Sequence, residues 1–421
     1  MKTIPVILSA IFVTFSVRPS EQQCLTANDQ RVPSPTGHLG LYTGQQSFSL
    51  SLLQAINQFN PHENIFFSPY STYHALLMTY FISANQTEMY LKKTLKLSPT
   101  QDKADIFNAY KLDEYTTRTG LIKNGTYEFT NANRIYVAKD IPLRTCVLSL
   151  FGSELIQFNF QENPEAARTS INHWVEEKTH DMIKNLLPPG TIDEKTSLVL
   201  VNAAYFKGKW ENKFNPEETK PEVFYISPSK QTIVDMMHVE ATFNYDVSEN
   251  LMAHILELPY EGEDISMYIL LPPFAKEDGI DTVLKKLTID NFKEVVNGSL
   301  SPRQVQVSLP KFSLEHTIEL APVLEVIGIG DVFQDDADFT GLTVDKDVNI
   351  GTGIHKARLD VDEHGSRAAA ATSILTDRIA VDTDGSVEFK CNRAFIFFIY
   401  NKEMGSVLFF GIFNNPYLLY H

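Results

Sequence analysis

Residues 361–389 read VDEHGSRAAAATSILTDRIAVDTDGSVEF, and the four consecutive alanines at 368–371 set this stretch apart from an ordinary loop. Turns and linkers favour glycine, proline and short polar residues. At strand period, one face carries only uncharged side chains, most of them small: Ser366, Ala368, Ala370, Thr372 and Ile374. Arg367, Ala369 and Ala371 fall on the other face. Such a segment could enter a sheet between two strands, where a charge on the buried face would lose its water without gaining a partner.

The same alanines allow a different interpretation. Alanine is a good helix former and a poor strand former, so composition alone favours a solvent-exposed helical turn or a linker. The surrounding sequence decides between the two interpretations.

Seven segments, in order along the chain, resemble signature sequences of the serpins, a family of serine protease inhibitors. They are 64–71 (NIFFSPYS), 202–210 (NAAYFKGKW), 307–312 (VSLPKF), 355–357 (HKA), 362–365 (DEHG), 392–395 (NRAF) and 409–416 (FFGIFNNP). The resemblance implies the serpin fold. This α+β fold has a large central, mostly antiparallel sheet, smaller sheets, surrounding helices and an exposed reactive loop, here at about residues 363–388.

The organisation of the chain fits this resemblance. The 421 residues are 43% hydrophobic, which allows a large core. Strand-like and helix-like segments mix without regular alternation, as in α+β proteins. No long interior linker or repeat divides the chain. We therefore expect a single serpin domain at 45–421, preceded by an N-terminal extension at 21–44.

The serpin resemblance implies a conformational mechanism. A serine protease attacks the loop and forms an acyl-enzyme. The hinge then enters the large sheet as a new strand and carries the protease with it, so the intact protein must be metastable. Gly365 is the pivot, since glycine turns most freely. The implied hinge residues are Glu363, Gly365, Ser366, Ala368, Ala369, Ala370, Ala371 and Thr372.

Two positions are possible for the scissile bond. The spacing from Gly365 that is usual in inhibitory serpins gives Ile379–Ala380, which implies a protease with an apolar specificity pocket. One residue earlier, Arg378–Ile379 resembles a bond cut by trypsin-like enzymes, whose pocket aspartate requires a cation. Arg378 is the only basic residue in 368–389. We therefore favour Arg378–Ile379, and expect an extracellular trypsin-like serine protease as the partner, such as one from a zymogen cascade.

Two other functions are compatible with the sequence. One is an enzyme of unrecognised type, since the eleven histidines leave a catalytic site possible. The sequence contains no G-x-S-x-G, H-E-x-x-H, C-x-x-C or P-loop motif, however. The other is a non-inhibitory serpin that acts as a carrier or chaperone. Such members commonly carry charged or bulky residues on the inserting face of the hinge, and Ser366, Ala368, Ala370 and Thr372 are neither. The departures from the family pattern, His364 and Ala394, do not touch that face. We expect an inhibitor, not an enzyme.

The N-terminus is expected to direct secretion. A charged start precedes the apolar run at 4–17, which has the length of a signal peptide and is too short to span a bilayer comfortably. We expect residues 1–20 to be removed; a buried N-terminal strand is the alternative. Three glycosylation sequons, which fit the secretory route, begin at Asn85, Asn124 and Asn297.

The three cysteines, Cys24, Cys146 and Cys391, are too few and too scattered for a disulfide framework or a zinc site. At least one thiol must lack an intrachain partner. Cys391 lies in a strand-like run and is interpreted as a small buried hydrophobe.

The formal net charge of −16 argues against nucleic-acid binding and favours a soluble protein. Some serpins bind heparin-like glycosaminoglycans through a basic helix. The nearest candidate cluster is Lys92, Lys93, Lys96 and Lys103, which Asp102 and Asp105 dilute, so we interpret it as a solvated helix face. The acidic run at 331–338 lacks the glycine and terminal glutamate of a calcium loop. We expect a monomer with no metal, cofactor or membrane partner.

Local patterns place several elements. Apolar residues at helical spacing predict a helix at 47–57, after an extended tail at 20–44. Ser68 and Pro69 predict the cap and first position of a second helix, and a third is expected at 166–186. Trp174 and Trp210 are interpreted as core residues. Strands are predicted at 64–67, 129–137, 198–205, 255–258, 266–271, 304–309, 394–400 and 407–412.

Overall fold

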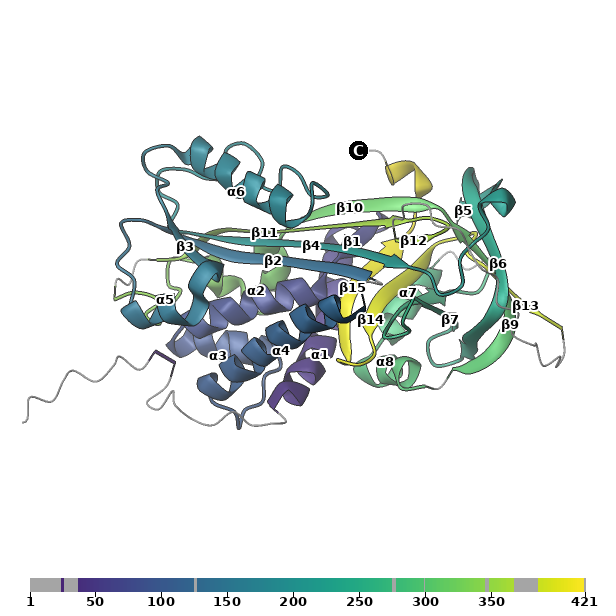
Figure 1. Ribbon diagram of the computed structural model, residues 1–421, viewed down its shortest axis with the longest axis horizontal. Helices are drawn as coiled ribbons and strands as arrows, with labels where there is room; N and C mark the ends of the chain where they lie inside the picture. Colours follow the sequence, from purple (N-terminus) through teal and green to yellow (C-terminus); the bar gives the residue numbers. More distant parts are fainter. Residues whose placement is uncertain are drawn as a thin grey trace, which may run out of the picture.

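The computed structural model describes residues 24–25, 37–124, 127–274, 278–298, 300–344, 348–366 and 385–419. These residues form an α+β fold, as predicted (Figure 1). The helices are α1 (Gly37–Phe59), α2 (Pro69–Ile82), α3 (Asn85–Thr94), α4 (Lys103–Asn124), α5 (Thr145–Phe151), α6 (Pro164–Lys178), α7 (Gly279–Lys286), α8 (Ile289–Val296) and α9 (Leu320–Val326), with the 3-10 turns η1 (Gly152–Glu154), η2 (Pro216–Glu218), η3 (Gly330–Phe333) and η4 (Pro416–Leu419). No helix among the described residues is both long enough and apolar enough to cross a bilayer.

The strands are β1 (Ile65–Phe67), β2 (Tyr127–Ala138), β3 (Leu155–Phe158), β4 (Leu198–Lys209), β5 (Lys220–Ser227), β6 (Lys230–Ser248), β7 (Ala253–Pro259), β8 (Ile265–Leu271), β9 (Ser301–Pro310), β10 (Phe312–Glu319), β11 (Ile350–Val361), β12 (Gly365–Ser366), β13 (Val387–Lys390), β14 (Phe395–Asn401) and β15 (Ser406–Phe413). The strand predictions correspond to β1, β2, β4, β7, β8, β9, β14 and β15.

The central sheet has the strand order β10-β11-β4-β2-β3. β10 with β11 and β2 with β4 are antiparallel, whereas β11 with β4 and β2 with β3 are parallel. Figure 1 shows α6 across one face of this sheet and α2 and α4 on the other. Because helices cover both faces, β4 reads as a nearly continuous apolar run rather than as an alternating strand.

The second sheet has the order β1-β15-β14-β8-β7-β6-β9-β13, and β5 pairs with β6. Its neighbours are antiparallel except β13, which runs parallel to β9. Because β13 ends this order, the segment that follows the loop lies at a sheet edge.

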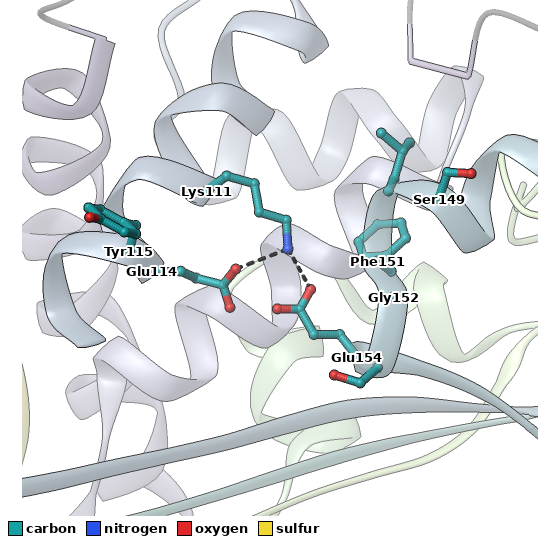
Figure 2. Close-up of a pocket in the computed structure, with 9 residues that line it drawn as sticks. Lys111, Glu114, Tyr115, Ser149, Phe151, Gly152 and Glu154 are labelled. Carbon is teal, nitrogen blue, oxygen red and sulfur yellow. Dashed lines mark hydrogen bonds and ion pairs between the residues drawn. The ribbon is translucent and has the colours of Figure 1, made fainter. Parts of the chain in front are cut away.

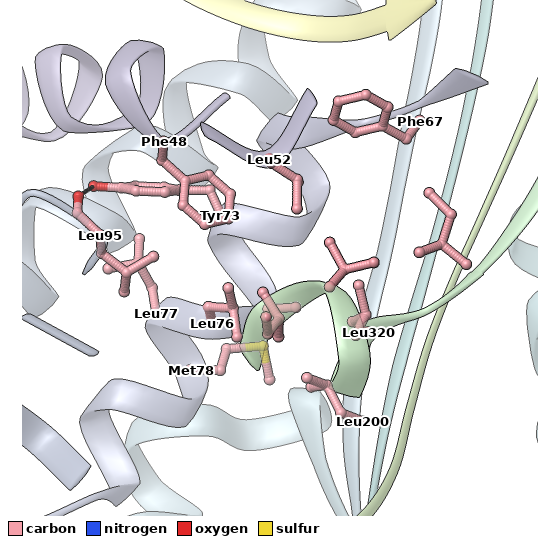
Figure 3. Close-up of a cluster of buried hydrophobic side chains, with 14 of the residues drawn as sticks. Phe48, Leu52, Phe67, Tyr73, Leu76, Leu77, Met78, Leu95, Leu200 and Leu320 are labelled. Atoms are coloured by element: carbon pink, nitrogen blue, oxygen red, sulfur yellow. Dashed lines mark hydrogen bonds between the residues drawn. The ribbon is translucent and has the colours of Figure 1, made fainter. Parts of the chain in front are cut away.

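Helix α2, which packs in the core between α1 and the central sheet, begins at a capped N-terminus. Ser68 Oγ accepts a hydrogen bond from the N–H of Ser71 (3.1 Å), and Pro69 occupies the first helical position, as predicted. Every residue of α2 is buried, so this helix is covered all round. Figure 3 shows side chains of this core. Tyr73, Leu76 and Leu77 come from α2, Phe48 and Leu52 from α1, Leu200 from β4 and Leu320 from α9.

A buried polar cluster joins three helices. Asp113 of α4 is 1% exposed and accepts hydrogen bonds from Tyr42 of α1 (2.6 Å) and Tyr70 of α2 (2.7 Å). His74 Nε2 lies 2.7 Å from the same carboxylate. A buried carboxylate is costly without such partners, so the cluster fixes α1, α2 and α4 in one arrangement.

Two helix predictions are wrong at one end. α1 begins at Gly37, ten residues before the predicted start, so residues 37–44 are helical rather than an extended tail. Gln45, directly after these residues, is buried, and its Nε2 donates to the distant backbone oxygen Val407 O (2.8 Å). α6 ends at Lys178, and residues 180, 181 and 185 after it have positive φ, which a helix cannot contain.

The structure also shows the surroundings of the two tryptophans and of Lys103. Trp210 is buried, as predicted, whereas Trp174 is only partly buried, with the guanidinium of Arg134 3.9 Å from its ring centroid. Lys103 is not on a solvated face: it is buried, and its Nζ lies 2.8 Å from Glu88 Oε2. The candidate basic cluster therefore contains at most three solvated lysines: Lys92, Lys93 and Lys96.

Cys24 and Cys146 form a disulfide that joins the N-terminal segment to α5. The cysteine spacing did not predict this bond, because 122 residues separate the two positions. Cys391 is buried, as predicted. It is the free cysteine of the described residues, and burial raises the pKa of its thiol. A thiol with a raised pKa is a poor nucleophile.

Candidate functional site

The predicted hinge begins with a tight turn after β11. Asp362 and Gly365 close this turn through backbone hydrogen bonds, Asp362 N to Gly365 O (2.8 Å) and Gly365 N to Asp362 O (3.2 Å). The Asp362 carboxylate also accepts from the N–H of His364 (2.9 Å). An aspartate that bonds its own turn in this way stabilises the chain reversal.

Two glycines bring β12 onto the end of β4. Gly365 pairs with Lys209 and Ser366 with Gly208, in antiparallel orientation. Gly365 has a φ of 143°, and a Cβ at this position would lie 2.1 Å from the carbonyl oxygen of Gly208. A Cβ on Gly208 would lie 2.7 Å from the ring of Tyr260. Larger residues at either position would strain the backbone or separate the strands.

Trp210, directly after β4, holds the turn from the other side. Its backbone N–H donates to His364 O (3.0 Å), and its indole Nε1–H donates to Asp362 O (3.0 Å). The side chain is 1% exposed and stacks on Tyr260 with ring centroids 4.5 Å apart. The indole therefore packs in the core and fixes the turn at the same time.

Glu363 ties the turn to two further segments. Its carboxylate, 8% exposed, accepts hydrogen bonds from Lys311 Nζ (2.8 Å) and Thr219 Oγ1 (2.9 Å), and its carbonyl accepts from Phe214 N (2.9 Å). Burial alone would raise the pKa of Glu363, but the hydrogen bonds from Lys311 and Thr219 outweigh it and hold the pKa below its ordinary value. The carboxylate is therefore charged at neutral pH.

Beyond the hinge, β4 and β11 pair directly with each other. The ladder is parallel and runs from Ile350 opposite Leu198 to Arg358 opposite Tyr205. A strand that entered here would run antiparallel to both neighbours, because β12 already runs antiparallel to β4. It would replace one slanted parallel ladder with two antiparallel ladders, which are slightly more stable per residue.

Buried polar side chains connect this strand pair to α2. Asn202 of β4 donates to Ser71 Oγ (2.6 Å), and His355 Nε2 of β11 accepts from the backbone N–H of Ser68 (2.9 Å). Burial lowers the pKa of His355 to about 3, and His316 of β10 acts in the same direction. His355 is therefore neutral at neutral pH, as an acceptor must be.

At the far end of the predicted loop, the described chain resumes at Gly385. β13 pairs with β9 from Val387 opposite Val305 to Lys390 opposite Ser308. Lys390 Nζ lies 2.6 Å from Glu222 Oε2 of β5.

Comparison with known proteins identifies the family that shares this arrangement. The family model described as serpin (serine protease inhibitor) matches residues 43–416. The chain belongs to the serpin family. Serine protease inhibitor 88Ea of Drosophila melanogaster is 40% identical over 394 residues, which cover 90% of this serpin and 91% of the relative.

Solved serpin structures share the fold. Serpin48 of the insect Tenebrio molitor has a TM-score of 0.78 at 28% identity, covering 90% of this chain and 98% of that one. Human thyroxine-binding globulin has a TM-score of 0.80 at 26% identity, covering 90% and 99%.

The structure of this serpin brings Glu363 and Gly365 together in the turn and places the backbone of Ser366 on β4. The other predicted loop residues lie outside the described residues: Ala368, Ala369, Ala370, Ala371, Thr372, Arg378, Ile379 and Ala380.

The sequons differ in their surroundings. Asn85 begins α3, and its Nδ2 donates to Asp338 (2.7 Å). Asn297 is exposed at the C-terminal end of α8. Asn124 ends α4, and its side chain lies outside the described part of the chain. Among the described residues, no group of three or more His, Cys, Asp or Glu side chains could hold a metal ion.

Sequence reasoning missed the side chains that hold the hinge turn in this serpin. Trp210 was interpreted only as a packing residue, although its Nε1 also binds the turn. Lys311 and Thr219 were not singled out, although Lys311 lies within the quoted segment 307–312. Neither residue carries a local signal, because their shared partner, Glu363, is far away in the sequence.

Proposed function

We propose that this serpin is a suicide inhibitor of a serine protease, which it traps covalently when its cleaved loop enters the central sheet between β4 and β11. The observation that carries the proposal is β12. Two hinge residues already pair with the end of β4, next to the place where β11 begins to pair with the same strand. Insertion would extend this pairing rather than start a new one.

The register of β12 supports the assignment of the inserting face. Each further hinge residue would meet one residue earlier on β4, which gives the pairs Ala368 with Phe206, Ala370 with Ala204 and Thr372 with Asn202. These β4 residues are fully buried. A Cβ on Gly208, on the same face, would collide with the rings of Phe206 and Tyr260. Arg367 would meet Lys207, which is partly exposed on the opposite face. Small side chains are therefore what the buried face accepts.

Incubation with a panel of trypsin-like and chymotrypsin-like proteases tests the proposal. We expect a covalent complex that survives denaturing electrophoresis. Inhibitor cleaved in the loop should also melt at a higher temperature than intact inhibitor, because insertion adds a second ladder. If every protease cleaves the loop and stays active, the inhibitory proposal is wrong and a non-inhibitory role becomes the better account.

The proposed scissile bond is Arg378–Ile379, which makes the target a trypsin-like protease. The support is chemical: Arg378 is the only cation in 368–389 that could pair with the pocket aspartate of such an enzyme. Mass spectrometry of the peptide released from the complex tests it. A new N-terminus at Ile379 is expected, and one at Ala380 would overturn the choice. Arg378→Ala should abolish inhibition of trypsin-like enzymes.

We also propose that the protein is secreted and that residues 1–20 are removed. The Cys24–Cys146 disulfide supports this, because structural disulfides persist in oxidising compartments. Asn297 is better placed than Asn85 to carry a glycan, since the amide nitrogen of Asn85 already bonds Asp338. N-terminal sequencing and glycopeptide mapping of protein from the culture medium of expressing cells would test these points.

A further inference from the structure

A pocket of about 350 Å³ opens between α4 and the segment formed by α5 and η1, away from the hinge. Figure 2 shows Lys111 and Glu114 projecting from α4 toward Glu154 of η1. The lining residues are Lys111, Glu114, Tyr115, Ser149, Leu150, Phe151, Gly152, Ser153 and Glu154. The pocket therefore combines charged groups with apolar and aromatic surface, as ligand sites commonly do.

The charged groups of this pocket are not balanced. Lys111 Nζ lies 3.0 Å from Glu114 Oε2 and 2.8 Å from Glu154 Oε2, so one ammonium serves two carboxyl groups. The side chains are 33%, 24% and 18% exposed, in that order, so they face the pocket rather than a closed core. Room and exposure allow a second cation to reach the pair.

In the absence of a second cation, a proton on Glu154 balances the charge of the pair. Burial and the adjacent Glu114 raise the pKa of Glu154 to about 8. Burial also acts to raise the pKa of Glu114, but hydrogen bonds from Glu154 and Lys111 outweigh it and lower that pKa. At neutral pH, Glu154 is therefore protonated and hydrogen-bonded to its neighbour.

The other charged or titratable groups near the pair are already engaged. Tyr110 of α4 is fully buried, and its pKa is raised by burial and by both carboxyl groups. His74 of α2 lies against Asp113. Arg134 of β2 donates through Nε to the carbonyl of Ser153 (2.9 Å). Within the described residues, the pair has Lys111 as its one ion-pair partner.

We propose that this pocket binds a guanidinium group, such as the arginine side chain of a protein partner. A planar guanidinium presents its donors as a fork that can bridge two carboxylates, which a compact ammonium cannot do as well. The exposed ring of Tyr115 lines the pocket, and a guanidinium can stack on such a ring. A metal ion fits poorly, because two carboxyl groups supply too few ligands: the described residues contain no group of three or more His, Cys, Asp or Glu side chains that could hold one.

The rim of the pocket suits a polypeptide rather than a free amino acid. Tyr115, which lines the pocket, is 65% exposed. Leu112 of α4 and Leu148 of α5, each next in sequence to a lining residue, are 45% and 47% exposed. Apolar residues that flank an arginine in a partner would cover these side chains. An arginine held by charge and surrounded by apolar contacts is a common anchor of protein interfaces.

Binding of the guanidinium would displace the proton on Glu154, so affinity must depend on pH. Only the deprotonated pair offers two carboxylates, and the fraction in that form is about 3% at pH 6.5 and about 90% at pH 9 for a pKa near 8. Affinity should therefore rise roughly thirtyfold between these pH values.

The probe is N-acetylarginine amide, added to the intact full-length protein and followed by calorimetry and by the carboxyl ¹³C signals of ¹³C-glutamate-labelled protein. The isosteric N-acetylcitrulline amide, which has no charge, is the control ligand. We expect the arginine probe to bind with the stated pH dependence and to shift the Glu154 signal, and the citrulline probe to do neither. Equal binding of both probes, binding independent of pH, or no binding at pH 9 would overturn the proposal.

Variants keep the test specific. Glu154→Gln imitates the protonated side chain and should preserve folding; it should weaken probe binding at pH 9 at least tenfold and remove the pH dependence. Glu165→Gln, which also removes a carboxylate beside a cation, lies on α6 and should change nothing. Unaltered binding by Glu154→Gln would place the probe elsewhere and refute the assignment. The assay does not involve the reactive loop, so its outcome is independent of protease inhibition.

Discussion

The two ends of the reactive loop are held differently. At the N-terminal end, β12 pairs over two residues with β4, inside the central sheet, and buried groups such as Trp210 and Glu363 fix the turn. At the C-terminal end, β13 pairs over four residues with β9, at the edge of the second sheet. Its ion pair joins Lys390 and Glu222, which are 34% and 23% exposed.

This difference assigns a direction to the proposed movement. Beyond β12, β4 continues for ten residues, Leu198 to Tyr205 of which pair with β11, so a freed N-terminal segment has backbone partners to pair with. Beyond β13, the described sheet order ends. The loop end with the shorter pairing is thus the one that can extend it.

The largest expected effect comes from charging the inserting face. Ala368→Asp would place a carboxylate opposite the buried Phe206, and an unpaired buried charge costs several kcal/mol. Since about 1.4 kcal/mol changes a rate tenfold, deacylation should overtake insertion and the yield of covalent complex should fall more than tenfold. Arg367→Asp, on the exposed face beside Lys207, should keep most of the inhibition. Gel densitometry of complex against cleaved inhibitor measures both, and equal yields would refute the face assignment.

Two glycines at the loop ends provide a matched comparison. Gly365→Ala forces a Cβ against Gly208 O at a φ of 143°, and should lower the free energy of unfolding by roughly 2 kcal/mol. A Cβ on Gly385, at a φ of 31°, meets nothing within 4 Å. Gly385→Ala should therefore cost about 1 kcal/mol or less. Urea denaturation of both variants measures the difference, and a larger loss for Gly385→Ala would contradict the tighter packing at the hinge.

The pH dependence of stability separates the β4–β11 pair from the hinge. The pKa of His355 is about 3 in the folded protein and about 6.5 in the unfolded chain, so the unfolded chain takes up the proton first as pH falls. This contribution is complete above pH 6.5 and should be reduced by about 2 kcal/mol at pH 5. Glu363, whose pKa is lowered, loses its contribution only below about pH 4.3.

Melting temperatures at pH 7 and pH 5 test this assignment. The wild-type protein should melt at a lower temperature at pH 5, and His355→Gln should show a smaller decrease between the two pH values. An equal decrease in both proteins would assign the acid sensitivity to other groups.

A further comparison between the two loop ends uses two glutamates. Glu363→Gln leaves a nearly buried group without its charge-assisted bond to Lys311 and should cost roughly 1.5–3 kcal/mol. Glu222→Gln, at the more exposed C-terminal anchor, should cost about 1 kcal/mol or less. Denaturation midpoints would show the order, and a reversed order would mean that the edge anchor is the stronger one.

Local patterns predicted the elements whose neighbours are local. The cap at Ser68 and Pro69 follows from turn chemistry, and β1, β2, β4, β7, β8, β9, β14 and β15 follow from apolar runs. The start of α1 did not, because Gln45 is a polar residue whose burial depends on Val407, 362 positions later. The end of α6 was missed for a related reason: the apolar residues after Lys178 are buried, but in a non-helical conformation.

The candidate site shows the same division. The small face of the hinge and the pivot at Gly365 are visible in the sequence, since they are properties of consecutive residues. The contacts of Trp210 with Asp362 and of Lys311 with Glu363 join segments 152 and 52 residues apart. The same is true of the Cys24–Cys146 disulfide. No local pattern contains such pairings, so a structure was needed to find them.

The length of β4 sets the distance over which the loop can insert in the proposed mechanism. A strand of 12 residues, Leu198–Lys209, spans roughly 40 Å at about 3.3 Å per residue. In the proposed mechanism, this is the distance over which the inserted loop can transport an attached enzyme. A loop shortened by one residue between Gly365 and Arg378 would leave that enzyme roughly 3.3 Å short of the position that the full-length loop would give it. In the proposed mechanism, the length of the loop therefore sets the final position of the attached enzyme, whichever protease the loop attracts.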